Sequence, residues 1–133
     1  MSVVHSETLP VASETDMVVV RRRVREVSAQ VGLSLVDQTK LVTAASELAR
    51  NTLIYGGGGS MQLESLNGPR LGVRLTFVDQ GPGIPNVELA LKDGFTTGSG
   101  LGLGLGGSRR LVNEFEIDSG PGKGTRVAVT RWK

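Results

Sequence analysis

Glu47 and Asn51 stand four residues apart in a stretch without glycine or proline, so both side chains would project from one side of a helix. A carboxylate and an amide oxygen are hard donors of the kind that Mg²⁺ accepts, and the carboxylate could also orient a hydroxyl group for removal of its proton. Taken alone, such a pair more often decorates a helix surface. The pair therefore makes Glu47 a candidate catalytic residue and Asn51 a candidate metal ligand, and these roles depend on the combination with the other segments described below.

Asp79 begins the segment DQGPGIP, residues 79–85, directly after an apolar stretch. Gly81 and Gly83 permit positive φ and the two prolines fix φ at about −65°, so the turn would be stiff and would hold the carboxylate still. A carboxylate that faces a mostly apolar pocket can accept a hydrogen bond from an exocyclic amine such as that of adenine. A capped turn without a ligand is the alternative interpretation.

Glycine recurs through residues 98–107, GSGLGLGLGG, immediately before a predicted helix that carries Arg109 and Arg110. Glycine lets backbone N–H groups approach an anion, and the start of a helix adds free N–H groups with a partial positive charge. This pattern predicts a phosphate-binding loop. A merely flexible glycine loop is the alternative.

Two familiar nucleotide motifs are excluded by their context. Gly102, Gly104 and Gly107 spell GxGxxG, but neither the preceding strand nor the later acidic residue of a dinucleotide site is present. The GKGT at residues 122–125 lacks the glycine and hydroxyl spacing of a P-loop. Thr125 instead opens the last predicted strand, where its hydroxyl could bond a base edge or Asp79, although alone it is typical of a turn exit.

Two helices are expected to position the first of these segments. Val20, Val24, Val27 and Val31 recur at helical spacing and predict a helix over residues 14–31, and a second helix is expected over residues 35–54. The second helix is apolar on most sides and is expected to lie between two layers. The polar side of the first carries arginines at positions 21, 22, 23 and 25, which form either a solvated face or a docking patch for an acidic partner.

The rest of the chain predicts strands over residues 61–66, 71–78, 115–118 and 125–132, with short helices over 86–91 and 105–113. The first dozen residues, which include His5, read as a flexible tail or at most one more strand, giving the order (β)ααββααββ. We expect an α/β protein of the α+β kind: a two-layer sandwich whose mixed, mostly antiparallel sheet is covered by helices on one face.

Composition narrows the function classes. A chain of 133 residues is expected to form one domain, 1–133, and its net charge of +2 is too small for a dedicated nucleic-acid binder. The absence of cysteine and the single histidine argue against redox and zinc chemistry. Without a leader peptide or a long apolar run, a cytoplasmic protein that does not enter the membrane is expected.

An asparagine on a helix, a strand that ends in Asp-x-Gly-x-Gly, a glycine loop that opens a helix, and Gly-Thr on a late strand follow one another in this chain. In that order they resemble the GHKL (histidine-kinase-like) ATPase superfamily, over residues 14–133. Within it, the segments SELARN (46–51), DQGPGIP (79–85), DGFTT (93–97), RLVNEF (110–115) and the closing Gly-Thr with Trp132 look like the RsbT-like serine-protein kinases, which are bacterial switch proteins. The resemblance implies the GHKL (Bergerat) ATP-binding fold and protein-serine kinase activity.

The resemblance also implies a role for each matching residue. Glu47 would act as the base or water-orienting group, Asn51 would bind Mg²⁺, and Asp79 would accept the adenine amine, assisted by Thr125. Residues 86–99 would form a mobile lid. The other implied nucleotide-binding positions are Arg50, Gly81, Gly83, Ile84, Thr97, Gly100, Leu101, Gly102, Leu103 and Gly104.

The implied cofactors are ATP and Mg²⁺. The implied substrate is an RsbS-like STAS-domain protein of the stressosome scaffold, and the kinase released from it would act by partner switching on a downstream regulator such as a metal-dependent phosphatase. Neither nucleic acid nor membrane is an implied partner. Two alternatives remain: an anti-sigma factor kinase of the SpoIIAB type, and a non-catalytic ATP-gated binding module.

Overall fold

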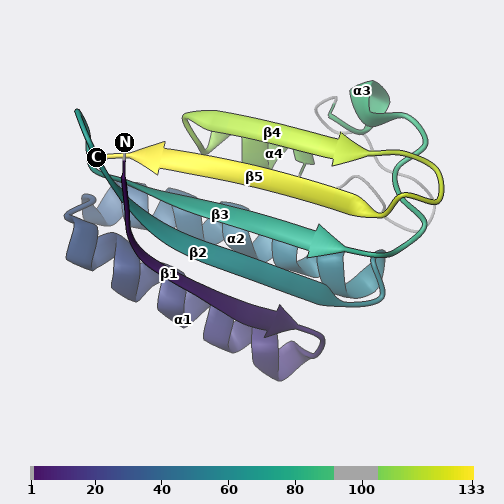
Figure 1. Cartoon of the computed structure of the whole chain (residues 1–133), viewed down its shortest axis with the longest axis horizontal. Coiled ribbons are helices and arrows are strands. Elements are labelled where there is room, and N and C mark those ends of the chain that lie inside the picture. The colour runs from purple at the N-terminus through teal and green to yellow at the C-terminus, as the bar shows by residue number, and fades with distance from the viewer. Residues whose placement is uncertain (1, 92–104) are drawn as a thin grey trace.

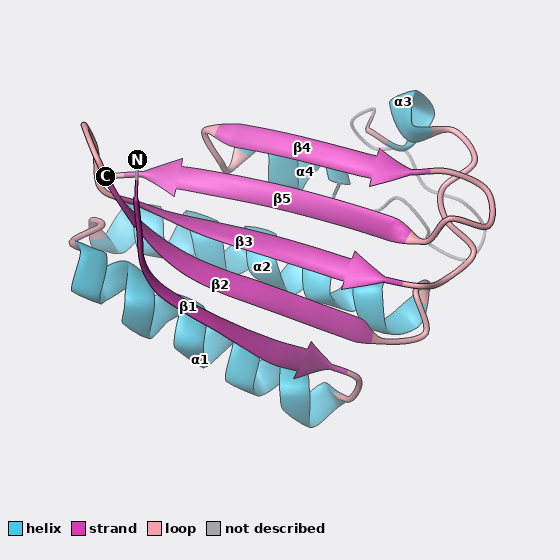
Figure 2. Ribbon diagram, in the orientation of Figure 1, coloured by secondary structure: helices cyan, strands magenta, loops and turns pink. Residues whose placement is uncertain are grey.

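The computed structural model describes residues 2–91 and 105–133, in which one strand is followed by pairs of helices and pairs of strands (Figures 1 and 2). No helix in these ranges is long and apolar enough to cross a membrane. The elements follow one another in the order β1 (Ser2–Val11), α1 (Glu14–Val31), α2 (Leu35–Ile54), β2 (Gly59–Asn67), β3 (Gly72–Asp79), α3 (Val87–Ala90), α4 (Leu105–Arg110), β4 (Glu114–Ser119) and β5 (Thr125–Trp132).

The strands form one sheet in the order β1-β2-β3-β5-β4, and each neighbouring pair is antiparallel. Helices α1, α2 and α4 lie on one face of this sheet (Figure 2). The expected two-layer α+β sandwich is therefore confirmed. The parallel pairing that a mixed sheet implies does not occur among the described strands.

The boundaries of α1 and α2 match those predicted, because the sequence supplies a cap at each start. The Oγ of Ser13 accepts the backbone N–H of Asp16, and the Oγ of Ser34 accepts that of Asp37, each at 3.1 Å. Gly32 ends α1 in a left-handed conformation with φ of 98°. Both helices then bury their apolar stripes against the sheet, around Val24, Leu41, Leu48, Leu63, Leu75 and Phe77.

The interpretation of the first dozen residues as a flexible tail is wrong. They form β1, an edge strand that pairs with β2 from Ser2 opposite Asn67 to Val11 opposite Gly59. Most of its side chains are exposed, so it lacks the clear apolar alternation that identifies a strand. The strand is held by pairing and by an ion pair between Glu7 and Arg23 of α1.

Helix α2 does not lie between two layers, contrary to expectation. It lies within the helical layer, in contact with α1 and with α4, and it packs on the sheet behind it. Val36 and Ile54, on its outer side, are more than half exposed. Its apolar residues on several sides are explained by three neighbours: α1, α4 and the sheet each cover one side of the helix.

Candidate functional site

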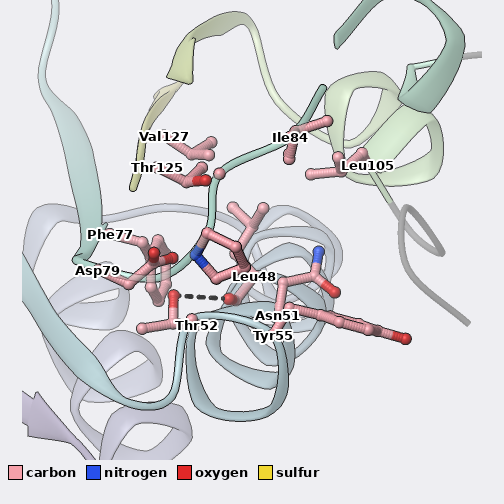
Figure 3. Close-up of a pocket in the computed structure, with 13 residues that line it drawn as sticks. Leu48, Asn51, Thr52, Tyr55, Phe77, Asp79, Ile84, Leu105, Thr125 and Val127 are labelled. Carbon is pink, nitrogen blue, oxygen red and sulfur yellow. Dashed lines mark hydrogen bonds between the residues drawn. The ribbon is translucent and has the colours of Figure 1, made fainter. Parts of the chain in front are cut away.

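A pocket opens where the last turns of α2 face the ends of β3 and β5, and Figure 3 shows its side chains. Its enclosed volume is about 70 Å³, and beyond this the pocket opens to solvent. Five residues predicted from the sequence line it: Asn51, Asp79, Gly83, Ile84 and Thr125. Its other lining residues are Leu48, Thr52, Tyr55, Gly56, Phe77, Pro82, Leu105 and Val127.

Asp79 is the charged group of this pocket. It is the last residue of β3, its exposed fraction is 7%, and it lies among apolar side chains such as Phe77 and Val127. Burial raises the pKa of Asp79, while hydrogen bonds from the backbone N–H groups of Gly81 and Thr125 act in the opposite direction. The N–H of Gly81 lies 2.9 Å from Oδ1. An ionised carboxylate here offers only hydrogen-bond acceptors to a ligand.

The loop over residues 79–85 is held against the turn between β4 and β5. The N–H of Gly122 donates to the carbonyl oxygen of Pro82 at 2.8 Å, and the N–H of Ile84 donates to Oγ of Ser119 at 2.8 Å. Gly83 has φ of 79°, and a Cβ there would lie 1.9 Å from the carbonyl oxygen of Gly120. This loop is thus packed closely on its neighbour.

Gly81 has a different reason to be glycine. The φ angle of Gly81 is not positive. A Cβ on Gly81 would instead lie 2.7 Å from Cα of Gly56, so the loop and the end of α2 meet backbone to backbone. The prediction that both glycines of DQGPGIP serve positive φ therefore holds for Gly83 alone.

The polar residues of α2 are distributed between the pocket and the surface. The side chain of Asn51 lies at the pocket (Figure 3). Glu47, one helical turn earlier, is half-buried and does not line the pocket, and Arg50 is exposed. In residues 2–91 and 105–133 no group of three or more acidic, histidine or cysteine side chains is arranged to hold a metal ion. A metal here would depend on Asn51 and on oxygens that a ligand brings.

Six of the predicted nucleotide-binding residues lie outside the described residues: Thr97, Gly100, Leu101, Gly102, Leu103 and Gly104. The expected lid, residues 86–99, is described as far as residue 91 and contains α3 there. Helix α4 begins at Leu105, whose side chain lines the pocket, and ends at Arg110 rather than at residue 113. It ends early because Asn113 turns back, its N–H donating to the carbonyl oxygen of Thr130 on β5.

Sequence reasoning missed several residues of the pocket. In the sequence, Leu48 and Tyr55 fall on the main apolar stripe of the second predicted helix, which is typical of core residues, and Thr52 has no feature that singles it out. All three line the pocket with Asn51: Leu48 lies three residues before it, Tyr55 four after it and Thr52 next to it. Helical spacing from Asn51 was the signal that could have found them.

Comparison with known proteins bears on this arrangement. Residues 36–133 match the family model described as histidine kinase-, DNA gyrase B- and HSP90-like ATPase. The chain belongs to this ATPase family. It is 40% identical over 123 residues to the serine/threonine-protein kinase RsbT of Bacillus subtilis (strain 168), covering 92% of both chains. Within the ATPase family the chain is therefore RsbT-like, and the expected enzyme class, a protein-serine kinase, is confirmed.

Other known proteins are similar to this chain at lower identity. The anti-sigma F factor of Thermoanaerobacter sp. (strain X514) is 29% identical over 110 residues, which cover 79% of this chain and 77% of that protein. Among solved structures, the RsbU and RsbW domains of Rv1364c from Mycobacterium tuberculosis match with a TM-score of 0.64 at 21% identity. This chain corresponds to 33% of that longer one and is covered over 97% of its own length. The mycobacterial sensor histidine kinase MprB matches with a TM-score of 0.57 at 20% identity, covering 96% of this chain and 97% of that one. These two structures share the fold.

Proposed function

We propose that this pocket binds the adenine of ATP and that the chain transfers the γ-phosphoryl group to a serine of a partner protein, as one ATPase domain over residues 1–133. One observation carries the proposal: a buried, hydrogen-bonded carboxylate, Asp79, is the charged group in an otherwise mostly apolar pocket. Such a wall suits a flat base with an amine at its edge, because the ring replaces water on the apolar surfaces and the amine satisfies the carboxylate.

The residues of the pocket would divide the work of binding. Asp79 would accept the exocyclic amine, while Leu48, Phe77 and Val127 would contact the ring and exclude water. Gly83 and Ile84 would close the loop side, which their packing against residues 119–124 keeps in place. The ribose and phosphates would then extend toward Asn51 and the start of α4, where the predicted phosphate-binding residues lead into Leu105.

Magnesium fits the donors at this end of the pocket. Mg²⁺ bound to a nucleotide keeps several waters and takes its other oxygens from the phosphates and from one or two side chains, and the amide oxygen of Asn51 would be one of these. When bound, it would offset the negative charge of the phosphates during transfer. Glu47, one turn before Asn51, would orient the serine hydroxyl and take its proton. Its half-buried position beside the pocket, rather than in its wall, is compatible with contact to a protein substrate.

The partner that we propose is an RsbS-like STAS-domain protein of a stressosome scaffold in the cytoplasm. Phosphorylation would weaken the complex and free the kinase to act on a downstream regulator such as a metal-dependent phosphatase. The support for this choice is the 40% identity to the Bacillus subtilis kinase along nearly the whole chain. Neither nucleic acid nor a membrane is required at any step.

The decisive experiment is the intact mass of such a STAS-domain protein after incubation with Mg-ATP and this chain. We expect the wild type to add one phosphoryl group, and Asp79→Asn and Glu47→Ala to add none. If no mass is added although ATP binds, the kinase proposal for this pair is wrong. A nucleotide-gated module that holds its partner without turnover would then explain the site better.

A second candidate function is suggested by the 29% identity to an anti-sigma F factor. In this case the chain would also hold a sigma factor and release it in exchange for another partner. Co-purification of a sigma factor with the wild-type chain, at a level that depends on added nucleotide, would favour this candidate.

A further inference from the structure

Ser119, the last residue of β4, connects two segments of the pocket wall although it does not line the pocket itself. Its Oγ accepts the backbone N–H of Ile84 at 2.8 Å and lies 2.9 Å from the carbonyl oxygen of Gly124 and 2.8 Å from Oγ1 of Thr125. It thereby joins the loop over residues 79–85 to the start of β5.

Strand register places these groups in one row. Ser119 faces Thr125 across the β4–β5 pair, and Thr125 faces Asp79 across the β5–β3 pair. Thr125 therefore lies between the serine hydroxyl and the pocket carboxylate. It serves both neighbours, because its backbone N–H donates to Asp79 and its side-chain hydroxyl contacts Ser119.

Only one arrangement of hydrogens satisfies all three contacts of Ser119. The N–H of Ile84 can only donate and the carbonyl oxygen of Gly124 can only accept, whereas a serine hydroxyl has a single hydrogen. That hydrogen must point to Gly124, so the contact with Thr125 is a hydrogen bond only if Thr125 donates. The hydroxyl hydrogen of Thr125 is then directed at Ser119, and its lone pairs are left for the pocket.

We propose that Ser119 is a positioning residue for base selection, which fixes the Thr125 hydroxyl as a hydrogen-bond acceptor toward the ligand. Together with ionised Asp79 it makes the polar edge of the pocket a row of acceptors. Such an edge favours a purine with a 6-amino group, a donor, over one with a 6-oxo group, an acceptor. This inference rests on the proposed function, because it assumes that a purine nucleotide occupies the pocket.

The test compares the binding of ATP and of inosine triphosphate, which carries a 6-oxo group where ATP carries the amine. In Ser119→Ala the Thr125 hydroxyl is free to rotate and to donate, so the 6-oxo group is penalised less. We expect the ratio of the two affinities to fall by about three- to tenfold, the effect of one hydrogen bond. In Ser119→Thr, which keeps the hydroxyl, the ratio should stay within about twofold of the wild type.

A double-mutant cycle separates positioning from a purely structural role. Thr125→Val removes the hydroxyl that Ser119 orients, so Ser119→Ala added to it should leave the affinity ratio unchanged. Ser34→Ala is the matched control, since it removes a serine hydroxyl from the N-cap of α2 and should lower stability without altering the ratio.

The possible outcomes distinguish this inference from the proposed function. If Ser119→Ala weakens both nucleotides by the same factor, or lowers the ratio equally with and without Thr125→Val, Ser119 does not act through Thr125 and the inference is overturned. If the wild-type chain binds ATP and the variants give either of these two results, only the role of Ser119 in base selection is wrong, and the proposed ATP site stands. If the wild type binds neither nucleotide, the ATP site itself is wrong and the inference falls with it.

Discussion

The carboxylate of Asp79 occupies space that Gly56 leaves open. A Cβ built on Gly56 would lie 2.3 Å from Cγ and 2.5 Å from Oδ2 of Asp79, well inside van der Waals contact. The first residue of the GGGG segment thus lets the end of α2 approach the pocket carboxylate directly. This glycine is required for its lack of a side chain, because its φ is not among the positive values found in the described chain.

Gly56→Ala should displace the Asp79 side chain and weaken ATP binding by about tenfold or more, the effect of losing one charged hydrogen bond. Gly57→Ala is the control: nothing lies within 4 Å of a Cβ there, but its φ of 73° makes the substitution strained. Both variants should lose stability, and only Gly56→Ala should lose affinity beyond that. Calorimetric titration with ATP at a temperature where both variants are folded measures this difference. Equal affinities of Gly56→Ala and Gly57→Ala for ATP would contradict the steric explanation.

Asp79→Asn should separate stability from function. Since burial raises the pKa of Asp79, the folded state binds the proton more tightly than the unfolded state does. The contribution of Asp79 to stability therefore falls as pH rises from the ordinary aspartate pKa through the raised one. Without ligand, Asp79→Asn should be as stable as the wild type or more stable near neutral pH, and it should lose that advantage in acid. Thermal unfolding between about pH 4 and about pH 8 tests this. A variant that is less stable than wild type at neutral pH would show that the ionised carboxylate stabilises the fold.

Glu47 and Asn51 should differ in what they contribute. Glu47→Gln removes the proposed base without removing a pocket residue, so ATP affinity should be kept while phosphotransfer falls by about a hundredfold or more. Asn51→Ala should weaken Mg-ATP and leave adenosine, which lacks phosphates, close to wild type. Binding of both ligands and single-turnover phosphotransfer distinguish the two variants. Loss of adenosine binding in Asn51→Ala would place this residue at the base instead of at the phosphates.

The ion pair between Glu7 and Arg23 should hold β1 on the domain. The hydrogen bond from Arg23 lowers the pKa of Glu7, so its contribution is present at neutral pH and is lost as pH falls through that lowered pKa. Arg23→Gln should cost about 0.5–1.5 kcal/mol near neutral pH, and less in acid. Arg22→Gln is a matched control, because Arg22 is 65% exposed and pairs only with Glu26 of its own helix among the described contacts. Urea unfolding at two pH values gives both differences. Equal losses for Arg22 and Arg23 would contradict a specific role for the pair with β1.

Much of the fold followed from local signals that tertiary contacts did not override. Ser13 and Gly32 mark the two ends of α1, and Ser34 marks the start of α2, because caps act on the backbone within one turn. Strand β1 was predicted only as an alternative to a flexible tail, since an edge strand with exposed side chains carries little periodicity and is defined by its partner β2.

The sequence predicted those residues of the candidate site that have a polar side chain at a characteristic position in a motif. It did not identify the residues that reach the site only through tertiary packing. Asp79 and Asn51 stood out by type and spacing. Tyr55 falls on the apolar stripe of the second predicted helix, and such a stripe does not distinguish side chains of the core from side chains that line a pocket. Ser119 has an ordinary residue type and was not considered, because only the pairing of β4 with β5 places it beside Thr125.

The alignment of β3 with β5 also constrains how this sequence can change in length. Asp79 and Thr125 are direct partners across that pair, and successive side chains point to opposite faces of a sheet. One residue inserted into or deleted from either strand would turn one of the two away from the pocket, even if every residue that contacts the ligand were retained. Length changes in this domain should therefore be tolerated in the turn over residues 68–71 and not within β3 or β5, so that ligand binding depends on the register of the sheet as much as on the residues of the pocket.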